Sequence, residues 1–163
     1  MTRIQAKFRS PILHEHNQLA ERYETKAVPI NHYYRLCLDQ WAKAFLGAKR
    51  TRALMNLNAI YQTGANVTLS SDWNVHSINP LEGIANSLIM GKTGLPSITA
   101  AIDAYTINAA YSLGIDKITG SIEVGKSADF AILDNDITKI PLDRISSSKV
   151  ILTILQGEIV FEK

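Results

Sequence analysis

The stretch that decides the fold is Asn66-Val67-Thr68-Leu69-Ser70-Ser71-Asp72-Trp73. Its apolar and β-branched run, residues 67–69, is typical of a short buried strand, and Gly64 ends the helical pattern before it. Asp72 follows this strand. Enzymes built on parallel sheets place reactive groups at the carboxyl ends of strands, because loops there surround a ligand while the sheet holds the geometry. Asp72 is therefore a candidate functional carboxylate; that it only caps a turn or the next helix stays an alternative.

Composition excludes several classes of protein. The 163 residues are 46% hydrophobic and 20% charged, which fits an ordinary chain with a real core. The net charge is +2 and the basic residues are scattered, so we expect no nucleic-acid partner. No apolar run approaches the ~20 residues of a membrane span, so we expect no membrane partner, and the N-terminus lacks a signal core. The single cysteine, Cys37, predicts no internal disulfide, a core position and a cytoplasmic location.

A second polar cluster, His14-Glu15-His16, follows a possible short strand that starts at Pro11. On a strand His14 and His16 point to the same side, and such a pair can bind a transition metal. A solvated strand end with two ordinary histidines is the alternative.

Helical periodicity alternates with strand signals through the first two thirds of the chain, which is the rhythm of a parallel α/β fold. We expect Gly47 to end one helix, and Thr51 to cap the next, whose buried stripe would be Leu54, Leu57, Ile60 and Tyr61. A proline-containing strand is predicted at 27–32. The predicted helices span residues 17–26, 33–50, 51–62, 80–90 and 98–113.

The last third changes character, since glycines and acidic turns separate short apolar runs. Strands are predicted at 128–133, 149–155 and 158–162, the last two joined by a tight turn at Gln156-Gly157. A boundary is expected near residues 115–120. The sequence thus predicts an α/β part, residues 1–117, and a small β part, residues 118–163.

Four segments of the chain resemble, in content and in order, those of the amidohydrolase-3 branch of the metal-dependent amidohydrolase superfamily. They carry the Ser-Asp-Trp segment, the Tyr-Thr-x-Asn-Ala-Ala helix, the Gly-Lys-x-Ala-Asp segment and the closing hairpin of that branch. In this chain they are residues 70–81, 104–110, 120–134 and 153–160. The resemblance is strong from about residue 51 to the end.

The resemblance implies a (β/α)8 barrel with one or two divalent metals, often zinc, and a small β-sandwich built from both chain ends. The fold class expected here is therefore α/β: the last strands and helices of such a barrel, plus the C-terminal part of the sandwich. Asp72 would match the carboxylate after the eighth strand, which contacts metal and moves a proton. His16 would match the histidine after the sixth strand. The 56 residues from His16 to Asp72 hold about two barrel units of ~30 residues each, which agrees with this assignment.

The same spacing leaves no room for the other assignment of His14-Glu15-His16, to the first strand, so His14 is expected to be structural or solvated. The chain also lacks room for the first five strands. We therefore expect the C-terminal portion of a longer enzyme for small amide-type substrates. Alone it would bind metal weakly or not at all, turn over no substrate, and either self-associate or pair with a complementing N-terminal chain.

The alternative is a non-catalytic remnant with a binding or regulatory role, similar to proteins of this branch named as regulators of exoenzyme production. Three further residues of the resemblance are expected to be architectural. Asn108 would tie a helix to a loop by hydrogen bonds, and Lys126 and Asp129 would hold a glycine-bounded turn.

Overall fold

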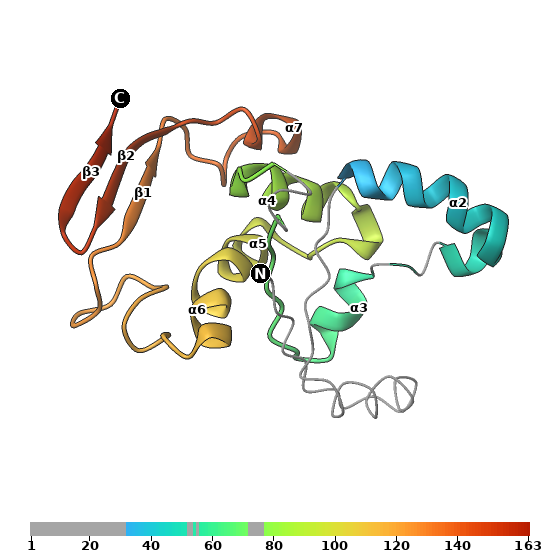
Figure 1. The fold of residues 1–163 in the computed structure, drawn as a ribbon, viewed down its shortest axis with the longest axis horizontal. Helices are drawn as coiled ribbons and strands as arrows, with labels where there is room; N and C mark the ends of the chain where they lie inside the picture. The colour runs from blue at the N-terminus through green and yellow to red at the C-terminus, as the bar shows by residue number, and fades with distance from the viewer. Residues whose placement is uncertain (1–31, 52–53, 55, 72–76) are drawn as a thin grey trace.

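The computed structural model describes residues 32–51, 54, 56–71 and 77–163. Helices occupy most of the described residues up to residue 113, and one antiparallel sheet follows in the C-terminal part of the chain (Figure 1). The predicted helix 17–26 lies outside the described residues. The described elements are α2 (His32–Thr51), α3 (Leu57–Gln62), α4 (Pro80–Ile89), the short 3₁₀ helix η2 (Gly91–Thr93), α5 (Ile98–Tyr105), α6 (Ile107–Leu113), β1 (Phe130–Leu133), α7 (Leu142–Ile145), β2 (Val150–Leu155) and β3 (Glu158–Glu162).

Helix α2 corrects one prediction and confirms another. It begins at His32, so this residue does not end a strand, and residues 27–31 lie outside the described part of the chain. Its backbone leaves the helical region at Gly47, with φ 75° and ψ 158°, as a glycine permits. A second helical stretch follows and ends at Thr51, so the first stretch ends at Gly47, as predicted, and α2 consists of two helices that meet at a kink.

Helix α3 starts later than predicted. Asn56, not Thr51, is its N-cap, and the Asn56 side-chain oxygen accepts a hydrogen bond from Ala59 N–H at 3.0 Å. The Thr51 hydroxyl instead donates to the Gly47 carbonyl at 3.0 Å, within its own helix. The predicted buried stripe holds only in part. Leu57 is buried and Ile60 packs against the core, but Leu54 and Tyr61 are 41% and 38% exposed.

Helices α4 and α5 follow their capping signals. The Asn79 side chain accepts from Leu81 N–H, and Pro80 occupies the first turn of α4. Ser97 caps α5 in the same way, through Ala100 N–H. The single helix predicted for 98–113 is wrong, however, because the backbone at Thr106 (φ −117°, ψ −97°) separates α5 from α6.

The core lies where α4 packs against α5 and α7. Small alanines on α5 are fully or almost fully buried, so the neighbouring elements approach it closely. The buried apolar residues that form this cluster are Leu57, Val67, Leu69, Leu81, Ile84, Ala85, Met90, Leu95, Ala100, Ala101, Ala104, Ile137 and Ile145.

The C-terminal sheet has the order β1-β2-β3, and both neighbouring pairs are antiparallel. All three strands were predicted. Gln156 and Gly157 join β2 to β3 with φ of 54° and 86°, the positive values that a type I′ hairpin turn requires. Helix α7 was not predicted, since its four residues are too short for helical periodicity, yet its Ile145 is completely buried.

Gly83 on α4 is a position where α4 and Tyr105 of α5 meet without room for a side chain. A Cβ atom there would lie 1.8 Å from the Tyr105 hydroxyl oxygen. We predict that Gly83→Ala lowers the free energy of unfolding by about 2 kcal/mol, because this overlap outweighs the ~1 kcal/mol that alanine gains over glycine in a helix. Urea unfolding measures the change. Tyr105→Phe in the same background should recover part of the loss, and an unchanged or higher midpoint for Gly83→Ala would contradict the packing.

Candidate functional site

The segment 66–71, which leads to Asp72, is the centre of the candidate site. Val67, Thr68 and Leu69 are all buried, as predicted. Among the described residues, however, the segment contributes only an isolated bridge residue, Asn66, and no paired strand. Its backbone groups are satisfied in another way.

A pair of hydrogen bonds to the helix junction holds this segment. Leu69 N–H donates to the Ala104 carbonyl at 3.1 Å, and the Asn108 side-chain amide donates to the Val67 carbonyl at 3.0 Å. In extended backbone the groups of residues 67 and 69 point to the same side, so Ala104 and Asn108 together act as the edge of a neighbouring strand. We call these two hydrogen bonds the α5–α6 clamp. They confirm that Asn108 ties a helix to a loop.

The break between α5 and α6 makes the clamp possible. Thr106 lies outside helical geometry, and its hydroxyl donates to the Ile102 carbonyl at 2.9 Å. A helix that ran on without a break would engage the Ala104 carbonyl with the N–H four residues later. The break directs that carbonyl to Leu69 instead. Asn66 completes the contact, since its side-chain amide donates to the Asn108 carbonyl at 3.3 Å.

Sequence reasoning found Asn108 but missed Ala104, Thr106 and Asn66. The available signal was the pair Thr106 and Asn108, because both residue types compete with helical hydrogen bonding and interrupt an alanine-rich helix.

Thr68 faces away from the helical core, since Val67 and Leu69 on either side of it belong to that core. It is only 3% exposed, and its hydroxyl has no hydrogen-bond partner in the described part of the structure. A buried hydroxyl without a partner costs stability. On the side away from the helical core, the segment therefore carries a hydroxyl group that no described residue hydrogen-bonds.

The predicted site residues Asp72 and His16 both lie outside the described residues, as does His14. Within the described ranges, three or more His, Cys, Asp or Glu side chains do not gather anywhere in a group suited to a metal ion. The described residues thus do not form a metal site by themselves, and the structure does not test the predicted ligands.

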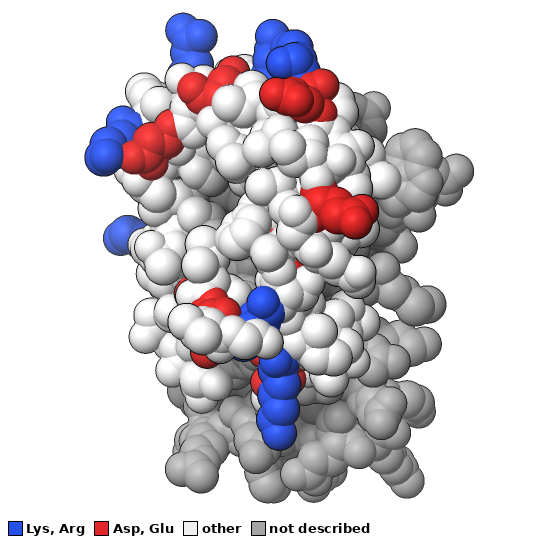
Figure 2. Space-filling view, turned by 90° about the vertical axis from the view of Figure 1, so that its left-hand side faces the viewer, with Lys and Arg blue, Asp and Glu red and all other residues white. Residues whose placement is uncertain are grey.

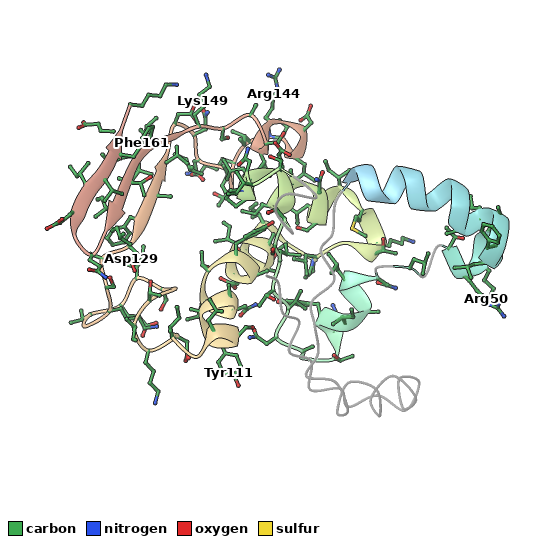
Figure 3. All side chains as sticks on the ribbon, viewed as in Figure 1. Arg50, Tyr111, Asp129, Arg144, Lys149 and Phe161 are labelled. Carbon is green, nitrogen blue, oxygen red and sulfur yellow. The ribbon has the colours of Figure 1, made fainter. Side chains whose placement is uncertain are left out.

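A second polar cluster centres on Asp129 and fixes the loop before β1. The Asp129 carboxylate accepts from Gln156 N–H at 2.8 Å, from the Thr119 hydroxyl at 2.7 Å and from the Ser127 hydroxyl at 2.8 Å. Figure 3 shows Asp129 at the end of the sheet where this loop meets the β2–β3 turn. Lys126 pairs with Glu123 at 3.1 Å and also donates to the Ser121 hydroxyl. Lys126 and Asp129 thus both hold the turn, as predicted.

The surface around the sheet carries charges of both signs and several exposed apolar side chains. Figure 2 shows Lys and Arg beside Asp and Glu at the top of this face. Lys139 pairs with Asp136 at 2.8 Å. Ile122 is 85% exposed and Ile159 is 60% exposed. No described helix combines the length and apolar character that a bilayer crossing needs.

Comparison with known proteins identifies the family. The model described as Amidohydrolase family, of the amidohydrolase-3 branch, matches residues 16–161, which is most of the chain. This chain belongs to the amidohydrolase family. The match includes His16, Asp72 and every residue of the α5–α6 clamp, and it confirms the resemblance seen in the four sequence segments.

Two curated proteins are similar to about two thirds of this chain. An imidazolonepropionase from Agrobacterium fabrum is 33% identical over 112 residues, which cover 68% of this chain and 26% of the relative. An N-substituted formamide deformylase from Arthrobacter pascens is 29% identical over 118 residues, covering 68% and 22%. The chain thus spans about a quarter of the length of these relatives.

A solved amidohydrolase from Thermotoga maritima has the same fold, with a TM-score of 0.60 and 16% identity. The similarity covers 97% of this chain and 43% of that one. The described helices and the sheet therefore have the arrangement of an amidohydrolase, as the sequence predicted in outline.

The hydrogen bonds to Asp129 give stability a pH dependence. The Gln156 N–H, then the Thr119 and Ser127 hydroxyls, hold the pKa of Asp129 below its ordinary value of 3.8. A carboxylate with a lowered pKa stabilises the fold fully above that ordinary value and loses its contribution as the pH falls through the lowered pKa. We predict that Asp129→Asn lowers the melting temperature at pH 7. Below pH 4 the difference in melting temperature between the variant and the wild type should become smaller. Thermal unfolding from pH 7 to pH 2.5 measures it, with Asp143→Asn as a control on the exposed surface. A gap that stays constant with pH would contradict the prediction.

Proposed function

We propose that this chain is the C-terminal part of a metal-dependent amidohydrolase that hydrolyses a C–N bond in a small amide or cyclic amide. Asp72 is its proton carrier, and Asp72 and His16 are two of its metal ligands. The observation that carries the proposal is the family match over residues 16–161, which includes both residues. The named activities of the two curated relatives support this class of reaction.

The chemistry assigned to this chain is proton transfer. Asp72 and His16 would help to hold a divalent metal, with zinc as the expected ion, which would lower the pKa of a water molecule to about 7 and so supply hydroxide at neutral pH. The Asp72 carboxylate takes the proton that this water gives up. It then delivers the proton to the leaving nitrogen as the C–N bond breaks, and the hydroxyl oxygen stays on the carbonyl carbon.

The proposed architecture has two parts. Residues 1–117 are the last strands and helices of a (β/α)8 barrel, and residues 118–163 are part of a small β-sandwich. Two observations support it: the unpaired hydroxyl of buried Thr68, which suits a barrel interior completed by further chain, and the exposed apolar side chains of the sheet. The reducing location suggested by the single cysteine would be the cytoplasm.

An incomplete barrel should bind metal weakly, since catalytic zinc usually takes three protein ligands and this chain offers two candidates. We predict that Co²⁺ binds weakly to the chain, and that Asp72→Asn and His16→Ala each lower the affinity by more than about tenfold. His14→Ala is the matched control and should leave the affinity unchanged. Titration followed by isothermal calorimetry measures binding.

The same preparation should not turn over N-substituted formamides or imidazolone-type cyclic amides. One tightly held metal ion per chain, or turnover by the chain alone, would contradict its being an incomplete enzyme. Equal losses for His14→Ala and His16→Ala would contradict the assignment of His16.

A non-catalytic remnant with a binding or regulatory role is the second candidate. The observation that favours it is the set of exposed apolar side chains on the sheet, such as Ile159 and Phe161, which a binding partner could cover. In this case the exposed apolar side chains of the sheet would be covered by self-association, whereas an enzyme part would take a complementing N-terminal chain.

Self-association makes a separate prediction. Sedimentation at increasing concentration should show a mass above that of one 18.0 kDa chain, because exposed apolar side chains such as Ile159 and Phe161 gain by burial. Ile159→Lys should shift the equilibrium towards the monomer, and Lys139→Ala is a control at an exposed ion pair. A wild-type chain that stays monomeric throughout would contradict this prediction.

A further inference from the structure

We propose that Asp129 and Asp134 make the C-terminal sheet an acid-sensitive unit, which opens on proton uptake while the helical core stays folded. The two aspartates lie on either side of β1, one directly before Phe130 and one directly after Leu133. Each carboxylate bonds to the backbone at one end of β2, so that the two strands are fastened together at both ends.

The geometry of these two bonds is nearly symmetrical. At one end the Asp129 carboxylate accepts from Gln156 N–H at 2.8 Å, directly after β2. At the other end the Asp134 carboxylate accepts from Lys149 N–H at 2.8 Å, directly before β2. There Asp134 N–H also donates to the Lys149 carbonyl at 2.9 Å. Figure 3 shows Asp129 and Lys149 at opposite ends of the sheet. We call the two carboxylate bonds the end bonds.

The end bonds matter because β1 is short. It has four residues, and its pairing with β2 is interrupted by a register shift between Ile132 and Leu133. Such an irregularity disrupts the ladder of backbone hydrogen bonds locally. The end bonds are therefore a large part of what holds β1 to β2, and they join positions 27 and 15 residues apart in the sequence.

The sheet makes its main contacts within itself. Strand β2 pairs with β1 and β3, the helices α4, α5, α6 and α7 contact one another, and no described helix packs comparably on a strand. Leu133, at the end of β1, reaches the helical core, but every residue of β3 is exposed. Loss of the end bonds should therefore open the sheet as a unit of low local stability, without opening α4 and α5.

Protons compete with both end bonds. The Lys149 N–H, and then the Asn135 amide and the Lys149 charge, hold the pKa of Asp134 below its ordinary value of 3.8. The pKa of Asp129 is lowered by neutral donors, first the Gln156 N–H. Both carboxylates recover their ordinary pKa when the sheet opens, so opening takes up protons. The end bonds thus contribute fully above that ordinary value, and their contribution is lost as the pH falls through the lowered pKa values.

Other carboxylates of this region differ from the two aspartates in what they join. Glu123 pairs with Lys126 at 3.1 Å, within one loop. Asp136 accepts from Thr138 N–H at 3.0 Å and pairs with Lys139 at 2.8 Å, within its own turn. Its pKa is also lowered, to about 2, yet it does not fasten one strand to another. Asp136 is therefore a matched control for the end bonds.

Hydrogen exchange of the whole chain at pH 6 and pH 2.5 tests the proposal, with each rate corrected for the intrinsic effect of pH. In the wild type, protection of the β1 and β2 amides should fall on acidification, while the α5 amides keep theirs. At pH 6, Asp129→Asn and Asp134→Asn should each lower protection in β1 and β2 about tenfold, because a neutral amide oxygen accepts more weakly than a carboxylate. Asp136→Asn should leave it within about twofold, and the double variant of the end bonds should lose most of the pH dependence.

Protection that falls equally in α5 and in the sheet on acidification would overturn the inference, because the chain would then unfold as a whole. Equal effects of Asp136→Asn and the two end-bond variants would also overturn it, as would a double variant whose pH dependence is undiminished. The acid comparison in the wild-type chain needs no substitution, so it decides the question even where a variant fails to fold.

Discussion

The hydrogen bonds that Ala104 and Asn108 make to the extended segment 66–71 are the constraint on which the helical part depends. A buried strand must satisfy its backbone groups, and an unpaired buried group costs about 1–3 kcal/mol. Here a helix break, not a neighbouring strand, satisfies the edge at Val67 and Leu69. Because the segment is held in this way, its apolar side chains pack on α4 and α5, and the core forms around them. The non-helical geometry of Thr106 is thus a structural requirement and not an irregularity.

In the C-terminal sheet, hydrogen bonds stabilise a turn whose backbone conformation is unfavourable. Gln156 adopts a positive φ of 54°, which is unfavourable for a residue with a side chain. Its N–H is held by the Asp129 carboxylate, and Gly157 N–H donates to the Ala128 carbonyl at 3.0 Å. The loop before β1 therefore supports the turn between β2 and β3. This explains why a glycine-bounded segment around Lys126 and Asp129 is linked to a hairpin some 27 positions later.

How much the sequence could predict follows from the range of each signal. Pro80 after Asn79, the Ser97 cap and the Gln156-Gly157 turn act within a few residues, so α4, the start of α5 and the hairpin were predicted correctly. The break at Thr106 was not, because it is stabilised by Val67 and Leu69, some 40 residues earlier in the chain. Thr51 was wrongly predicted as a cap for a different, local reason, since its hydroxyl donates to the Gly47 carbonyl four residues earlier. The candidate ligands His16 and Asp72 rest on spacing and family resemblance, and the described residues do not test them.

The two parts of the chain differ in how fully this chain buries their apolar side chains. Around α4 and α5 the core is closed by side chains of this chain, from Leu57 to Ile145. On the sheet every residue of β3 is exposed, and on the other side of the segment 66–71 the Thr68 hydroxyl is buried without a described partner. Unmet apolar and polar groups at two separate places are costly for a chain that functions alone. The chain spans about a quarter of the length of these curated relatives, and the segment leading to Asp72 is held by hydrogen bonds on its helical side.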